Sequence, residues 1–206
     1  MPNPATPVAA ATESLFRLLE SELWVVTAHN GTRGGGLIAT WVSQASIDPK
    51  MPTVATAIAV NHYTRELIDA GRSFGLHLLR PEQIELVWRF ALASGRDVDK
   101  LAGLKWQPGE HGAPLLSDCF ATLDCRVYDR HDGGDRIYYW ADVVASTVDD
   151  AAVKAGVRPL TDRQVITMAS DEQKTALKAG LLADADLQRP LLMAHRAKLQ
   201  STNSSE

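Results

Sequence analysis

One stretch of this sequence combines residue types that could hold a ligand, and it begins with three glycines at 34–36. Glycine lets the backbone bend and come close to another molecule. The residues after it are mostly small or hydroxyl-bearing, where an ordinary buried strand would carry Val, Ile or Leu. They are Ala39, Thr40, Ser43, Ala45 and Ser46, with one large aromatic residue, Trp41, among them. This composition predicts a strand that lies along a flat ligand.

These residues also have ordinary structural interpretations, which stay open at this point. Trp41 could belong to the core, and Ser43 and Ser46 could be solvent-facing strand residues. The six histidines show no spacing typical of metal ligands, so no metal site is predicted. We expect them in loops or on the surface, with His131 kept as a candidate redox-site group.

The elements that must position this stretch are mainly strands. Patterns of β-branched and apolar residues between turn signals predict six of them, at 23–28, 36–47, 53–60, 73–79, 120–128 and 136–148. The first two are joined by a hairpin containing Asn30-Gly31, and Asp48-Pro49 ends the second. Hairpin order favours an antiparallel barrel or sandwich.

Helices are expected between and after the strands. Short helices are predicted from residue 12, over 65–70 and over 81–93, with another beginning within 94–100. Residues 106–117 are predicted to be a loop. Beyond residue 160 the strand signals end and two or three helices follow, with Thr161 and Ser170 as N-caps and Pro190 at the start of the last helix.

Composition narrows the class of protein. The chain has 206 residues, 45% hydrophobic and 22% charged, with a net charge of -4, which argues against a nucleic-acid-binding protein. No apolar run approaches the roughly 18 residues that span a membrane, and the first residues do not resemble a signal peptide. A cytoplasmic protein is therefore expected, with Cys119 and Cys125 as unpaired, buried thiols.

Three motifs in their order resemble the flavin reductase-like family of FMN-binding split barrels, which includes flavoredoxins and monooxygenase reductase components. They are the runs at 39–43, 63–68 and 94–100, read as ATWVS, YTRELI and SGRDVDK. The resemblance covers roughly residues 22–150. It implies a six-stranded antiparallel split β-barrel that forms a homodimer and binds FMN near the interface. The predicted division is a tail and short helix at 1–21, the barrel at 22–155, and a helical C-terminal arm and tail at 156–206.

The resemblance also implies which residues hold the cofactor. Ala39, Thr40 and Trp41 would run past the isoalloxazine ring, and Ser43 and Ser46 would help to hold it. Three further residues, Asn61, Tyr63 and Thr64, match the loop near the ribityl phosphate, and Ser94, Arg96 and Lys100 match the segment that closes over the cofactor. A flavin phosphate needs cations or backbone N–H groups, for which Arg65, Arg96 and Lys100 are the candidates.

The function implied is that of an oxidoreductase in which FMN passes electrons from NADH or NADPH to free flavin, a partner monooxygenase or another redox protein. Where many family members have Gly-Asp-His in the last hairpin, this chain has Gly134-Asp135-Arg136. That difference favours the alternative of an FMN-binding electron carrier without its own nicotinamide site. A split barrel that holds a deazaflavin or haem is a third candidate, and no side chain is arranged as a nucleophile.

Overall fold

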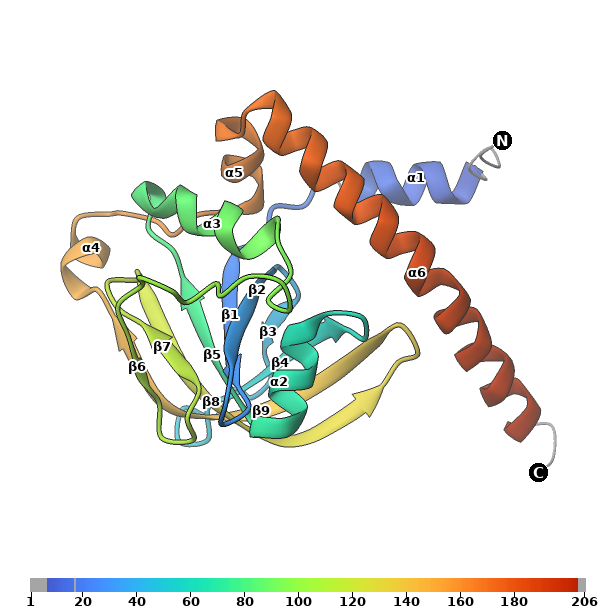
Figure 1. Ribbon diagram of the computed structural model, residues 1–206, viewed down its shortest axis with the longest axis horizontal. Coiled ribbons are helices and arrows are strands. Elements are labelled where there is room, and N and C mark those ends of the chain that lie inside the picture. The colour runs from blue at the N-terminus through green and yellow to red at the C-terminus, as the bar shows by residue number, and fades with distance from the viewer. Residues whose placement is uncertain (1–6, 17, 204–206) are drawn as a thin grey trace.

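The computed structural model describes residues 7–16 and 18–203, so the ends of the two predicted tails lie outside the described residues. Its main feature is a seven-stranded antiparallel sheet in the order β2-β1-β5-β8-β9-β4-β3 (Figure 1). The strands are β1 (Trp24–His29), β2 (Gly34–Ala39), β3 (Val42–Gln44), β4 (Thr53–Ala59), β5 (Ser73–Leu78), β8 (Ala121–Asp132) and β9 (Arg136–Val148). The mainly β fold with helices is as predicted, whereas the count of six strands is wrong.

The extra strand arises because the predicted strand at 36–47 is two strands. β2 pairs with β1 at one edge of the sheet, and β3 pairs with β4 at the opposite edge. The chain bends between them at Thr40 and Trp41, and the carbonyl of Trp41 accepts a bond from Ala57 N–H at 3.3 Å. A sheet whose two edges are joined by two residues must curl, and this curl gives the half-barrel.

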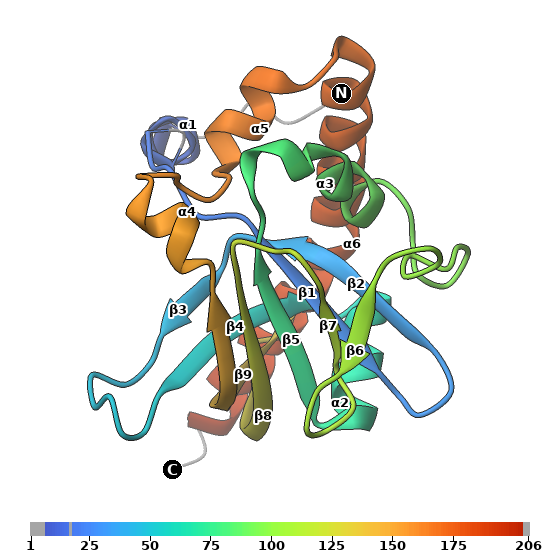
Figure 2. The ribbon, with the colours of Figure 1, turned by 90° about the vertical axis from the view of Figure 1, so that its left-hand side faces the viewer.

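The helices lie at one end and along one side of this sheet. They are α1 (Pro7–Phe16), α2 (Tyr63–Gly71), the 3₁₀ turn η1 (Pro81–Gln83), α3 (Ile84–Ala91), α4 (Asp150–Lys154), α5 (Asp162–Met168) and α6 (Asp171–Asn203). Figure 2 shows α3, α4 and α5 gathered at one end of the sheet. α2 packs on β1 and β2 and inserts the fully buried Leu67 and Ile68 into the core beside Phe74 and Tyr139.

Three expectations about the connecting segments are wrong. The predicted loop at 106–117 contains a small hairpin of β6 (Trp106–Pro108) and β7 (Pro114–Leu116), and 94–100 forms turns rather than a helix. Pro190 lies inside α6, a single helix of 33 residues. Pro190 is exposed, so water can hydrate the carbonyl that its missing N–H leaves unbonded. The N-caps at Thr161 and Ser170 are confirmed.

A buried histidine on β5 joins this strand to β1 and β7. His77 is fully buried on β5, where its Nδ1 lies 3.0 Å from the Val25 carbonyl and its Nε2 accepts the Leu116 N–H at 3.0 Å. The expectation of a surface histidine is therefore wrong here. Cys119 and Cys125 are both unpaired; the second is buried and the first partly exposed. Within the described residues no helix has the length and apolar character to cross a membrane.

Candidate functional site

A continuous groove runs between the sheet and α6. It consists of three cavities of about 310, 430 and 360 Å³ that share Leu37, His62 and Asp184 in their walls. Its floor is the C-terminal half of β2, its sides are the 60–64 loop and the end of α3, and its cover is the middle of α6. We call it the α6 groove. Ligand sites in proteins commonly have volumes of several hundred Å³.

Most of the residues that the sequence proposed for the cofactor line this groove. At one end are Ala39, Thr40 and Trp41, and at the other are Asn61, Tyr63, Thr64, Ser94, Arg96 and Lys100. The exceptions are Ser43 and Ser46, which line a separate cavity of about 600 Å³ between β3, β4 and β9. The structure thus brings the three motifs together and leaves these two serines outside the α6 groove.

The aromatic end of the groove is formed by Trp41 and Arg136. Trp41 is 56% exposed, so its interpretation as a core residue is wrong. The Arg136 guanidinium lies 4.2 Å from the centroid of the indole, a cation–π contact. One of its terminal nitrogens donates to Gln188 Oε1 at 3.1 Å, and its buried Nε has no hydrogen bond but lies 3.7 Å from an Asp135 carboxylate oxygen in an ion pair. The guanidinium on the Trp41 ring is therefore held by Gln188 and by the ion pair with Asp135.

The three glycines make room for side chains rather than for a ligand. A Cβ on Gly36 would lie 2.8 Å from the Phe90 ring, and one on Gly34 would lie 2.6 Å from Leu101. Lys100 fixes this packing, since its Nζ donates to the carbonyls of Gly36 at 3.0 Å and of Phe90 at 2.7 Å. Burial lowers the pKa of Lys100 to about 8. Lys100 thus stabilises the floor of the groove from within the protein.

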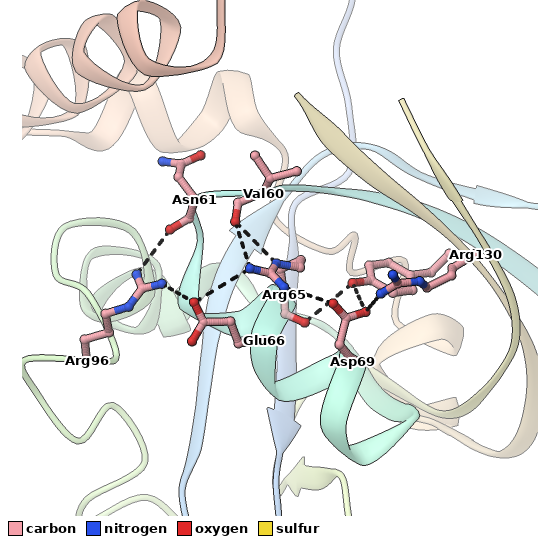
Figure 3. Close-up of polar contacts among 8 residues, drawn as sticks. Val60, Asn61, Arg65, Glu66, Asp69, Arg96 and Arg130 are labelled. Atoms are coloured by element: carbon pink, nitrogen blue, oxygen red, sulfur yellow. Dashed lines mark hydrogen bonds and ion pairs between the residues drawn. The ribbon is translucent and has the colours of Figure 1, made fainter. Parts of the chain in front are cut away.

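At the opposite end of the groove two arginines flank the ring of Tyr63, and one of them, Arg96, lines the groove. The guanidinium groups of Arg33 and Arg96 lie 5.6 and 5.4 Å from the Tyr63 ring centroid. Arg96 donates to the Asn61 carbonyl at 3.1 Å and forms an ion pair with Glu66 (Figure 3). With its side chain 45% exposed, Arg96 keeps access to an incoming anion. Arg96 lines this end of the groove, whereas Arg33 lines a separate cavity, so Arg96 is the cation here that suits a phosphate.

Arg65, the other candidate phosphate cation, is engaged elsewhere. It donates to the Val60 carbonyl and to Asp69 at 3.0 Å, and Arg130 bonds the other oxygen of Asp69 (Figure 3). Burial raises the pKa of Asp69, but the hydrogen bonds from Arg130, Arg65 and Tyr139 outweigh it and hold the pKa below its usual value. Arg65 does not line any of the three cavities. Arg65 thus orients Asp69, and Asp69 anchors α2 to β8 through Arg130 and to β9 through Tyr139.

The cover of the groove contributes polar groups that the sequence did not single out. Asp184 accepts from Asn61 Nδ2 at 2.8 Å and lies 2.9 Å from His62 Nε2. Gln188 donates to Asn61 Oδ1 at 3.2 Å in addition to accepting from Arg136. The i, i+4 spacing of Asp184 and Gln188 places both on one helix face, but that spacing alone marks no site. His131, kept as a candidate, lies exposed on β8 and does not line the groove.

The residues present fit a flat, anionic cofactor. A small-residue strand beside an aromatic side chain provides a slot, the Arg136 guanidinium lies on that aromatic ring, and Arg96 provides a cation at the far end. A flavin mononucleotide has a planar ring with acceptor edges at one end and a phosphate at the other. The chemistry of the groove therefore matches such a molecule at both ends.

Comparison with known proteins gives consistent matches. The model of the family described as "Flavin reductase like domain" matches residues 16–174. The chain is 35% identical over 141 residues to the high molecular weight rubredoxin of Moorella thermoacetica. The aligned region covers 68% of this chain and 58% of that relative. This chain therefore spans less than two thirds of that relative's length.

Two solved structures illustrate the shared fold. A homologue of nitrilotriacetate monooxygenase component B from Mycobacterium thermoresistibile superposes with a TM-score of 0.60 and 26% identity, over 74% of this chain and 83% of that one. The NADH:FAD oxidoreductase of Streptomyces globisporus superposes with a TM-score of 0.64 and 22% identity, over 78% of this chain and 91% of that one. The second likeness, at this identity, concerns the fold.

Proposed function

This chain belongs to the flavin reductase-like family, and from that premise we propose that it is a flavin-dependent oxidoreductase whose α6 groove binds FMN. The proposed reaction passes electrons from a reduced donor, NADH or NADPH, through FMN to free flavin or to a partner protein. The observation that carries the proposal is the convergence of the three family-like motifs on one groove. That groove has an aromatic end and a cationic end.

Different residues of the groove would contact different parts of the cofactor. Ala39, Thr40 and Trp41 would lie along the ring, with Arg136 as a donor beside it, and Arg96 with Tyr63 and Thr64 would hold the phosphate. When bound, the flavin supplies hydride acceptance at its N5 and onward electron transfer. The chain's own task is to orient the ring, supply hydrogen bonds and limit the access of water. No side chain is required as a nucleophile.

The donor and acceptor come from the comparisons only by analogy. One structural neighbour is named as an NADH:FAD oxidoreductase and another as component B of a monooxygenase. These names support a nicotinamide donor and a partner monooxygenase as candidates. A homodimer fits the exposed apolar side chains of α6, among them Leu181, Leu182 and Leu187, each more than half exposed. A cytoplasmic location stays a prediction.

A second candidate function is favoured by the position of Arg136. Its guanidinium lies on Trp41 and its terminal nitrogen is bonded to Gln188, so this side chain already occupies the face beside the proposed ring site. A protein that holds FMN there but admits no nicotinamide would be an electron carrier. Turnover separates the candidates, since a carrier binds FMN without rapid oxidation of NADH or NADPH.

The test starts with binding. Purified protein is mixed with excess FMN and passed over a desalting column, and the visible absorbance is measured, with boiled protein as the control. Retained flavin bands support the groove as a cofactor site, and steady-state oxidation of NADH and NADPH then decides between reductase and carrier. A colourless protein that also fails to bind FMN in a fluorescence titration would refute the proposed function.

A further inference from the structure

α6 covers the groove with little apolar packing. A helix that belongs to a core normally buries an apolar stripe. Among the described side chains of α6, at 171–202, Gln188 is the buried one, at 7% exposure. Leu181 and Leu182 are 62% and 59% exposed. Along its middle, α6 is therefore held to the barrel largely by its polar contacts.

Those contacts use the groove's own binding groups. The Asn61 side-chain amide donates to Asp184 and accepts from Gln188, and His62 Nε2 also faces the Asp184 carboxylate. Arg136 donates to Gln188. A carboxylate only accepts hydrogen bonds, as do a phosphate dianion and the carbonyl oxygens at the edge of a flavin ring. Asp184 and Gln188 thus satisfy the groups that an anionic ligand in the groove would require.

The position of these residues in the chain separates them from the barrel. The family match ends at residue 174, so Asp184 and Gln188 lie beyond it. α6 is joined to α5 through Ala169, an extended residue at the end of α5, and Ser170. Further along α6, His195 packs against Gly134 in the β8–β9 turn. A Cβ added at Gly134 would lie 2.6 Å from the Cβ of His195. A rotation at the exposed Ser170 would lift α6 from the groove, leave the buried Ala169 in place and break the contact between His195 and Gly134.

We propose that α6 is an internal competitor for the groove: Asp184 and Gln188 bind Asn61, His62 and Arg136 in place of the ligand, so that flavin binding requires α6 to be displaced. This inference rests on the proposed function. It predicts that the apparent affinity for flavin is reduced by the fraction of molecules in which α6 is docked. Weakening the docked state must then strengthen binding.

The first test compares two matched variants of the full chain. Asp184→Ala removes the contacts to Asn61 and His62, whereas Asp186→Ala removes the same charge from an exposed site whose ion pair, among the described residues, is with Arg189 in the same helix. Titrations with FMN and with riboflavin follow flavin fluorescence. We expect Asp184→Ala to bind both ligands about tenfold more tightly than wild type, and Asp186→Ala to behave like wild type.

Riboflavin distinguishes competition from charge repulsion. It lacks the phosphate, so relief of repulsion alone would strengthen the binding of FMN and leave riboflavin unchanged, and that result would overturn the proposal. Equal flavin affinities in wild type and Asp184→Ala would also overturn it while leaving the proposed function intact. Failure of every form of the protein to bind flavin would instead refute the proposed function, and this inference with it.

A second measurement needs no variant. Hydrogen–deuterium exchange of the wild-type chain is followed over residues 177–192 with and without saturating FMN. Displacement of α6 predicts faster exchange there when FMN is bound, because a helix released from the barrel frays more readily. Slower exchange would mean that α6 closes on the ligand, and it would overturn the proposal.

Discussion

The buried His77 should make the fold sensitive to mild acid. Its Nε2 accepts the Leu116 N–H and its Nδ1 therefore carries the proton that it donates to the Val25 carbonyl. Protonation of Nε2 would place two N–H groups against each other. Burial lowers the pKa of His77 from its ordinary value of 6.5 to about 4, although the bond to Val25 opposes that shift.

The direction and the magnitude of this pH effect on stability follow from proton linkage. Between pH 6.5 and 4 the unfolded chain binds a proton at His77 that the folded chain does not, so stability falls as the pH falls through this window. Each pKa unit corresponds to roughly 1.4 kcal/mol. Across the full window His77 therefore contributes about 3 kcal/mol to the free energy of unfolding, and all of this contribution is present above pH 6.5.

The assay is urea unfolding at pH 7, 6, 5 and 4.5 for wild type and for His77→Gln. Glutamine can donate to Val25 and accept from Leu116 but does not titrate. Carboxylates such as Asp69 add an acid sensitivity that both proteins share, so the comparison isolates His77. We expect wild type to lose about 2 kcal/mol more than the variant between pH 7 and 4.5. Parallel pH profiles would refute the reasoning.

Three further predictions concern the groove and its support. Gly36→Ala should lower the free energy of unfolding by about 2 kcal/mol, because its Cβ would meet Phe90 and a backbone oxygen. Gly180→Ala, with open space around it, should raise the free energy of unfolding by up to about 1 kcal/mol. Thermal unfolding tests both variants. Thr56→Val should raise the free energy of unfolding by about 1 kcal/mol, since the buried Thr56 hydroxyl has no partner. Arg96→Gln should weaken FMN binding about tenfold and leave riboflavin binding nearly unchanged in fluorescence titrations, if Arg96 holds the phosphate; equal losses for both ligands would contradict that role.

The strands were predictable because their signals are local. β-branched runs, Asn30-Gly31 and Asp48-Pro49 place the hairpins and their ends without knowledge of the fold. The break at Thr40 was not predictable in this way. It depends on β2 pairing with β1 while β3 pairs with β4 at the other edge, and no residue near Thr40 specifies those non-local partners.

The glycine run shows how a correct local inference can have a different cause. Glycine at 34–36 does permit a close approach to the backbone, as expected, but the groups that approach are Phe90 and Leu101. Lys100 was predicted beside the cofactor and does line the groove, yet its ammonium bonds two backbone carbonyls. Residue type indicates which contacts are possible, and only the packing decides which partner makes them.

The cover of the groove was the part least accessible from sequence, and the reason bears on function. Asp184 and Gln188 lie on a long, mostly exposed helix, where a carboxylate and an amide normally face water. Their partners Asn61 and His62 are more than 120 positions away. The three family-like motifs line the groove, whereas the groove-facing part of α6 lies beyond the family match. It is therefore the packing of α6, and not one of the family-like motifs, that brings Asp184 and Gln188 to the groove.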